Sequence, residues 1–213
     1  NGNQWWVIDA TSAEQQTGST RGLHMGGGYP NATSTVTYQE IDITGDYIMF
    51  GDLTFGAGKI TNAGFGSRTK GFTAGGRTYQ TGNTDHNVIQ EHEFATTGNF
   101  NDFGDLSTTR NEVMSMSNST RAVIAGGNNP TSFNIMEYVT MSSAGNAVDF
   151  GDQFQTTSSA GGNLASPTRG LMCGGENPSD GKVNTIQYIT LSTLGNSSDF
   201  GDMTVARRFP SAG

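Results

Sequence analysis

Apolar residues alternate with small or polar residues along much of this chain, and the same alternation returns about every fifty residues. It is clearest in four segments, at 22–25, 71–74, 122–125 and 170–173. The residues on one face of these segments lie two positions apart, as Leu23 and Met25, Phe72 and Ala74, Val123 and Ala125, and Leu171 and Cys173. A period of two is that of a β-strand, and no stretch keeps the 3.6-residue period of an amphipathic helix over three turns. We therefore predict an all-β fold.

A second strand is predicted after each of these segments, starting near Val36, Ile89, Met136 and Ile186. Its β-branched and aromatic residues are typical of strands. A third, weaker strand is predicted at 60–63 and 112–116. Between the first two strands each copy carries a Gly pair, at 26–27, 75–76, 126–127 and 174–175. Such a pair is expected where φ becomes positive or where another backbone comes close.

Further marks recur in the same register. A Thr followed by Arg or Lys opens each copy, at 20–21, 69–70, 120–121 and 168–169, and a Phe-Gly-Asp triplet lies near its end. In three copies the triplet closes the run Gly-Asn-x-x-Asp-Phe-Gly-Asp, at 98–105, 145–152 and 195–202, and the first copy has Asp46 and Met49 instead. A period of this length indicates a stacked or radial array whose units are too small to bury their own apolar faces.

We predict a single repeat domain over residues 1–213, with repeats at about 19–66, 67–117, 118–165 and 166–213 and residues 1–18 as the tail of a preceding repeat. WD40 and kelch blades have about 40–50 residues, whereas solenoid coils are usually shorter. A Gly pair that ends an apolar strand, with Tyr on the next strand, resembles a kelch blade. The predicted architecture is therefore a β-propeller of four kelch-like blades plus a spare terminal strand, and a trimeric β-rich fibre domain is the alternative.

Composition narrows the functions that fit this fold. Of 213 residues 31 are Gly and 14% are charged, and the net charge is −8. No Lys/Arg cluster exceeds Arg207-Arg208, so no nucleic-acid partner is expected. No apolar run reaches the length of a membrane span, so no membrane insertion is expected. The single Cys173 rules out an internal disulfide framework and a zinc site built on several cysteines.

The combined pattern resembles the kelch-like tandem-repeat proteins of marine bacteriophages, in which many copies lie in large virion or tail-fibre proteins. The matching residues include Thr168-Arg169-Gly170, Gly174-Gly175, Ile186-Gln187-Tyr188 and the run 199–207. The resemblance extends from about Thr11 to Ala212. It implies an exterior component of an extracellular virion, with other virion proteins as partners and a possible homo-oligomer.

The recurring charged residues have a structural and a functional interpretation. Asp-Phe-Gly matches the metal-binding triplet of protein kinases, but its recurrence at fixed register indicates an architectural role, with Phe between units, Gly at a bend and Asp in a turn. We expect a buried bridge in each repeat between the basic residue and the Asp of the triplet, and the alternative is a ring of carboxylates around a cation. His24 is predicted to be a packed or half-buried strand residue, and no metal site or cofactor is predicted.

The loop between the Gly pair and the second strand varies most between copies. It has six, ten, six and eight residues, whereas the surrounding sequence keeps its register. Insertions in one loop per repeat gather on one face of an array, often the face that binds. The candidate ligand-binding residues are Tyr29, Asn31, Tyr79, Asp85, His86, Asn128, Asn129, Phe133, Glu176, Asn177 and Asp180. Aromatic rings beside amides and carboxylates suit sugars, although the same residues also form ordinary polar turns.

These observations predict a non-enzymatic virion protein that binds a host-surface glycan or receptor through its variable loops. The alternative is a structural appendage or spacer that assembles with itself or with another virion protein through open strand edges. A glycan depolymerase or a kelch-type oxidase is the weakest hypothesis, because no catalytic residue is indicated and the three His do not supply a copper site.

Overall fold

The computed structural model describes residues 20–28, 32–54, 62–78, 82–158 and 162–209. Every regular element in these ranges is a β-strand, which confirms the all-β prediction. The described part of the chain contains no apolar helix of membrane-spanning length. Residues 1–18, predicted as the tail of a preceding repeat, lie outside the described residues.

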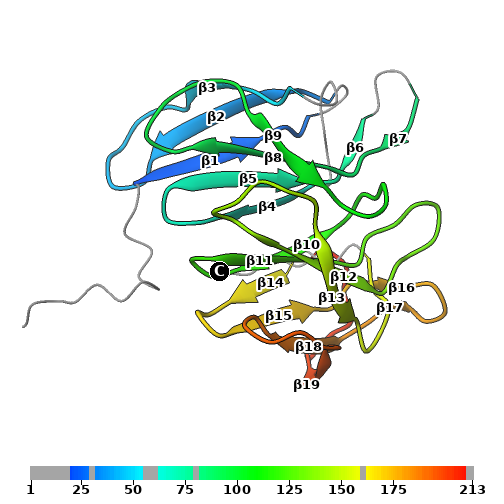
Figure 1. Cartoon of the computed structure of the whole chain (residues 1–213). Coiled ribbons are helices and arrows are strands. Elements are labelled where there is room, and N and C mark those ends of the chain that lie inside the picture. The colour runs from blue at the N-terminus through cyan, green and yellow to red at the C-terminus, as the bar shows by residue number, and fades with distance from the viewer. Residues whose placement is uncertain (1–19, 29–31, 55–61, 79–81, 159–161, 210–213) are drawn as a thin grey trace, which may run out of the picture.

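Four antiparallel sheets follow one another in chain order (Figure 1). The first consists of β1 (Arg21–Met25), β2 (Thr35–Glu40) and β3 (Ile48–Asp52). The second consists of β4 (Ala63–Gly66), β5 (Lys70–Ala74), β8 (Val88–Glu93) and β9 (Asn101–Asp105). The third consists of β10 (Met114–Ser117), β11 (Arg121–Ala125), β12 (Ile135–Thr140) and β13 (Val148–Asp152). The fourth consists of β14 (Gly162–Ala165), β15 (Arg169–Cys173), β18 (Thr185–Thr190) and β19 (Ser198–Asp202).

Two small hairpins project from the second and fourth sheets. They are β6 (Arg77–Thr78) with β7 (Thr84–Asp85), and β16 (Glu176–Asn177) with β17 (Gly181–Lys182). The first strands β4, β10 and β14 come from the ends of three predicted repeats, and each pairs with the strand that opens the next repeat. Each four-stranded sheet therefore joins two consecutive sequence repeats. The first strands of neighbouring sheets also touch, since the Ser115 hydroxyl on β10 donates to the Gly64 carbonyl on β4 at 2.9 Å.

The apolar core lies between sheets and not within one. One cluster joins Phe72 and Ala74 of the second sheet to Ile124 of the third. Another joins Val123 of the third sheet to Met172 of the fourth. Neighbouring residues on one strand, such as Val123 and Ile124, thus point into different clusters, as the period of two requires. Each inner sheet buries both faces, one against each neighbour.

The Gly pairs are where the sequence predicted a special backbone. In all four copies both residues have positive φ, for example 61° and 101° at Gly126 and Gly127. A Cβ on Gly126 would lie 2.4 Å from the Thr157 carbonyl oxygen. Both predicted reasons for glycine therefore hold here, the left-handed conformation and the close backbone.

The Phe-Gly-Asp triplet is strand and not turn, which corrects the prediction. It lies inside β3, β9, β13 and β19, and its Phe is the extra residue of a β-bulge, since Met136 pairs with Gly151 and Glu137 with Asp149. A bulge turns the side chain of its extra residue away from the regular alternation. Phe150 uses this to enter the core between the third and fourth sheets, so the predicted position of Phe between units is confirmed.

A recurring contact, here called the Gly-Asn clasp, joins each triplet to the next sheet. Between the second and third sheets, Gly145 N–H donates to the Phe103 carbonyl at 2.7 Å, and Ala147 N–H donates to the Asp105 carbonyl at 2.8 Å. The Asn146 side-chain oxygen accepts the Asp105 N–H at 3.0 Å. The same three bonds join the first sheet to the second and the third to the fourth.

The predicted bridge between the basic residue and the Asp of the triplet is wrong. Arg21 and Lys70 form ion pairs with Glu40 and Glu91, at 3.0 and 2.8 Å. The Arg121 guanidinium instead lies 4.4 Å from the centre of the Tyr138 ring and donates to the Leu191 carbonyl in the fourth sheet. The alternative cation ring has no support among the described residues, which contain no group of three His, Cys, Asp or Glu able to hold a metal.

Candidate functional site

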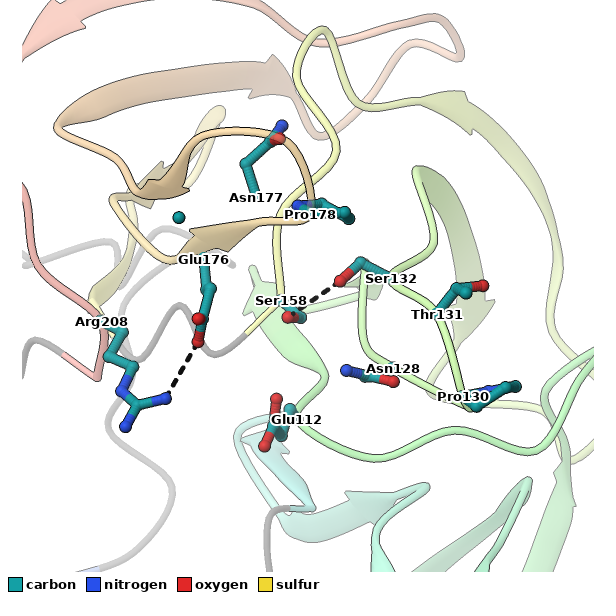
Figure 2. Close-up of a pocket in the computed structure, with 11 residues that line it drawn as sticks. Glu112, Asn128, Pro130, Thr131, Ser132, Ser158, Glu176, Asn177, Pro178 and Arg208 are labelled. Carbon is teal, nitrogen blue, oxygen red and sulfur yellow. Dashed lines mark hydrogen bonds and ion pairs between the residues drawn. The ribbon is translucent and has the colours of Figure 1, made fainter.

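The segments after the Gly pairs gather at one end of the sheets, where β6, β7, β16 and β17 project in Figure 1. A cavity of about 470 Å³ lies here between the loops of the third and fourth sheets. Its described lining is polar and is drawn in Figure 2: Glu112, Asn128, Pro130, Thr131, Ser132, Ser158, Glu176, Asn177, Pro178, Gly181 and Arg208. The variable loops thus do come together, as the sequence predicted for this region.

The walls of the cavity are set by backbone pairing that resumes beyond each Gly pair. Asn111 and Asn128 exchange backbone hydrogen bonds of 3.2 and 2.8 Å, and Ser158 and Glu176 exchange bonds of 3.0 and 2.8 Å. The Ser132 hydroxyl then donates to the Ser158 hydroxyl at 3.1 Å and joins the two walls. The polar side chains therefore stand on paired backbone, which limits their freedom before any ligand binds.

The charged groups of the cavity are Glu112, Glu176 and Arg208. Arg208 Nη1 lies 3.0 Å from Glu176 Oε2, and the two side chains are 52% and 40% exposed. An ion pair this exposed contributes little to stability, so its groups are free to exchange partners with a ligand. Figure 2 shows the Glu112 carboxylate on the same side of the cavity as this pair.

The backbone of Glu112 is unusual, but the repeat explains it. Its φ is 56°, a conformation that side-chain-bearing residues rarely adopt. Phe209 has φ 51° and lies seven residues after Asp202, just as Glu112 lies seven residues after Asp105. Because two copies share this conformation, we assign it to the connection between sheets and not to the cavity.

Three predicted site residues line the cavity, namely Asn128, Glu176 and Asn177. The Asn177 amide is already used, since its nitrogen donates to the Thr156 carbonyl at 3.0 Å. Asn129 is the equivalent residue of the third sheet and donates to the Thr109 carbonyl at 3.0 Å. These two amides therefore anchor their turns to the preceding connection.

The remaining described candidates lie outside this lining. Phe133 is half-buried, and Asp180 is exposed and donates its N–H to Asn177 Oδ1 at 3.3 Å. Asp85 belongs to the hairpin of the second sheet, where both its oxygens accept from Arg77, at 2.6 and 2.9 Å. His86 on the same loop has its Nε2 3.3 Å from the Thr78 hydroxyl. Tyr29, Asn31 and Tyr79 lie outside the described residues.

Asn111 connects the two loop regions. Its side-chain nitrogen is 2.9 Å from Asp85 Oδ1 and 2.8 Å from the carbonyl oxygen of Asn128. Asp85 is therefore one side chain away from the wall of the cavity. Its carboxylate is 5% exposed, so it supports the loop end from behind and does not face solvent.

Sequence reasoning missed Glu112, Ser158 and Arg208, because they lie in the segments that follow β9, β13 and β19 and not in the variable loops. The sequence signal that could have identified them is their spacing from the Phe-Gly-Asp triplet. The resulting site offers amide, hydroxyl, carboxylate and guanidinium groups, and its described lining has no aromatic ring. Such a set suits hydrogen bonding to hydroxyl-rich ligands. Cys173 is not a candidate nucleophile, because burial raises the pKa of its thiol and so disfavours the reactive thiolate.

No protein-family model matches the sequence, and no curated protein matches it. Among solved structures the chain is similar to that of YjhT, with a TM-score of 0.71 and 7% sequence identity. The match covers 89% of this chain and 64% of the YjhT chain, so this chain spans just under two thirds of that protein. At this identity the likeness shows a shared fold alone.

Proposed function

We propose that this chain is a non-enzymatic, exterior component of a phage virion that binds a host-surface glycan through the loop end of its sheets. The observation that carries the proposal is the polar cavity between the loops of the third and fourth sheets, lined by Asn128, Glu176 and Asn177. The phage and virion part rests on the repeat resemblance. The variable loop lengths support a face whose specificity changes while the sheets stay constant.

The finer architecture we propose is a β-propeller of kelch-like blades. The second, third and fourth sheets are four-stranded antiparallel meanders, and β10 contacts both β4 and β14. A shared inner edge of first strands is what a radial arrangement requires. Cores between consecutive sheets of one chain also favour a propeller over a trimeric fibre, whose core would lie between chains.

The chemistry of the cavity favours a sugar over a charged polymer. Its lining combines hydroxyl groups of Ser132 and Ser158 with the amide of Asn128 and one ion pair, Glu176–Arg208. Amide and hydroxyl groups donate and accept hydrogen bonds, which matches the dual character of sugar hydroxyls. Recognition of this kind needs no cofactor.

A binding screen against bacterial surface oligosaccharides, neutral and acidic, tests the proposal. We expect one class to bind, and we expect Glu176→Gln and Asn128→Ala each to weaken binding about tenfold through lost hydrogen bonds. Glu93→Gln, an exposed position at the end of β8, is the matched control and should bind as the unmodified chain does. Absence of binding to every oligosaccharide and to host-cell envelopes would contradict the proposal.

A structural appendage is the second candidate function, and a specific observation favours it. The outer surface of the fourth sheet exposes Phe200, whose counterparts are buried at all three inner junctions, and the outer surface of the first sheet exposes Tyr47, whose counterparts are buried or half-buried. A chain that self-associates through these surfaces but binds no glycan would be a spacer. Glycan binding by the monomer would leave the first proposal in place.

A further inference from the structure

One surface of the fourth sheet, here called the back face, consists of Arg169, Leu171, Tyr188 and Phe200. In the first three sheets the Phe of the triplet is 3%, 4% and 2% exposed, whereas Phe200 is 50% exposed. A hollow of about 250 Å³ lies beside it, lined by Arg169 and Leu171 among others. The residues equivalent to Leu171 in the second and third sheets are Phe72 and Val123, and both are fully buried.

No described residue forms a Gly-Asn clasp on the back face. A Cβ on Gly51, Gly104 or Gly151 would lie 1.9, 2.3 or 2.6 Å from the carbonyl oxygen of the clasping Gly. Around Gly201, apart from its two chain neighbours, no atom of the described residues lies within 4 Å of that position. The back face therefore has the shape of an inner junction without the loop that fills one.

Arg169 gives the same indication from a side chain. At the equivalent position, Arg21 donates to the Phe94 carbonyl at 2.7 Å and Arg121 to the Leu191 carbonyl at 2.9 Å, each in the following sheet. The Arg169 guanidinium lies 4.9 Å from the centre of the Tyr188 ring, and no carbonyl of the described residues accepts from it. Its hydrogen-bond donors face outward beside Phe200.

The first sheet has the complementary surface, here called the front face, which consists of His24, Ile41, Gly45, Asp46 and Tyr47. Ile41 is 68% exposed and Tyr47 is 55% exposed. Of the counterparts of Ile41, Met141 and Leu191 are 2% and 0% exposed and Phe94 is half-buried. Of the counterparts of Tyr47, Phe100 and Ser197 are 1% and 6% exposed and Ala147 is half-buried. His24 is exposed as well, against the prediction of a packed or half-buried strand residue, because no described sheet covers it. The two faces lie at opposite ends of the row of sheets (Figure 1).

We propose that the back face of one chain docks the front face of a second copy, head to tail. By analogy with the inner junctions, Gly45 N–H donates to the Phe200 carbonyl and Asp46 accepts the Asp202 N–H as a clasp. Arg169 reaches the Ile41 carbonyl. The occupant is a second copy because its own front face carries the apolar residue, the Gly and the side-chain acceptor at the spacing that the clasp uses.

Charge supports the same occupant. The loop of the front face contains Asp42 and Asp46, whereas the equivalent loops at 94–100, 141–147 and 191–197 contain no charged residue. In the docked arrangement Asp42 directly follows the carbonyl that Arg169 binds. Opposite charges at this place favour the second copy and orient it.

The proposed contact joins two different surfaces, so it is heterologous. Such a contact closes into a ring where the rotation allows it and otherwise continues as an open chain. The contact also leaves Arg207 without an ion pair. Its repeat equivalent Arg110 pairs with Glu137 of the following sheet, and the front face has Thr37 at that place.

Sedimentation velocity of the purified chain, from about 1 μM to about 1 mM, tests the proposal over the range of weak to moderate contacts. We expect a mass above that of one 22.4 kDa chain that rises with concentration. Phe200→Asp and Tyr47→Asp should each weaken association at least tenfold, because an anchor aromatic is lost from the centre of the contact. Phe154→Asp, at an aromatic residue 64% exposed elsewhere, is the matched control.

Mixing the two variants separates this contact from other modes of association. Tyr47→Asp keeps the back face and Phe200→Asp keeps the front face, so an equal mixture should form one-to-one complexes that neither variant forms alone. A chain that stays monomeric throughout the range would overturn the proposal. Unchanged association of both variants, or no recovery on mixing, would overturn it too. Circular dichroism of dilute samples checks that each variant is folded.

Discussion

The junction between the second and third sheets and the outer end of the fourth sheet share the Asp-Phe-Gly-Asp run and an Arg five residues after it, but have opposite surroundings. Phe103 is 4% exposed and Phe200 is 50% exposed. Arg110 is fully buried, whereas Arg207, at the same repeat position, is exposed. Each sequence repeat therefore supplies only half of the residues that form a buried site. The other half comes from the following sheet.

The largest expected effect comes from the ion pair at the covered junction. Arg110 is fully buried and donates to Glu137, and two of its three guanidinium nitrogens have no hydrogen-bond partner in the described structure. Burial lowers the pKa of Arg110, and the Glu137 charge opposes that shift. Glu137→Gln should cost about 3–5 kcal/mol of unfolding free energy in urea, because a buried charge loses its partner.

A double variant sharpens this prediction. Gln90 and Gln187 occupy the position of Glu137 in the second and fourth sheets, so Gln fits the site. Arg110→Met with Glu137→Gln should recover most of the loss. Arg207→Met at the uncovered end should stay within about 0.5 kcal/mol of the unmodified chain. A Glu137→Gln variant as stable as the unmodified chain would show that the pair does not hold the junction.

A matched pair of glycines tests the clasp itself. Gly104 and Gly201 have φ of 152° and 140°, so alanine is strained to a similar degree at both. Only Gly104 also faces a backbone, since a Cβ there would lie 2.3 Å from the Gly145 oxygen. In dilute solution Gly104→Ala should cost about 2–4 kcal/mol and Gly201→Ala about 1 kcal/mol, measured by urea unfolding. Equal losses would mean that neighbouring backbone does not restrict Gly104.

The smallest expected effect concerns the side chain of the clasp. Asn146 Oδ1 accepts the Asp105 N–H at 3.0 Å. Asn146→Ala should cost about 1 kcal/mol, the usual value of one such hydrogen bond. Asn146→Asp keeps an acceptor at this place, as Asp46 does in the first copy, and should cost less at neutral pH. Thermal unfolding of both variants makes the comparison, and a larger loss for Asp would contradict the acceptor role.

Much of the fold could be predicted from the sequence, because the period of two and the Gly pairs are local signals. The Phe-Gly-Asp strand was misread as a turn since the bulge at Phe150 interrupts the alternation that marks a strand. The prediction of an Arg–Asp bridge was wrong because Arg21 pairs with its cross-strand neighbour Glu40. In the third and fourth sheets the residue at the position of Glu40 is Thr140 or Thr190. A contact that is present in only some copies produces no recurring pair of residues in the sequence, so the repeat pattern does not indicate it.

The candidate site was predictable where loop length changes between copies. That signal pointed to Asn128, Glu176 and Asn177, which do line one cavity. It gave no indication of Arg208, which lies after β19 and outside the variable loops. It also could not show that Asp85 binds Arg77, because such pairing depends on the hairpin register.

The fold depends on neighbouring sheets covering one another, and amide hydrogen exchange at the triplets measures that cover. The Asp52, Asp105 and Asp152 N–H groups donate to the Asn of the following sheet. In dilute monomeric protein these three amides should exchange slowly, whereas the Asp202 amide, which no Asn of the described residues accepts, should exchange rapidly. Equal protection of all four amides would contradict the conclusion that the following sheet covers the first three triplets and leaves the fourth uncovered.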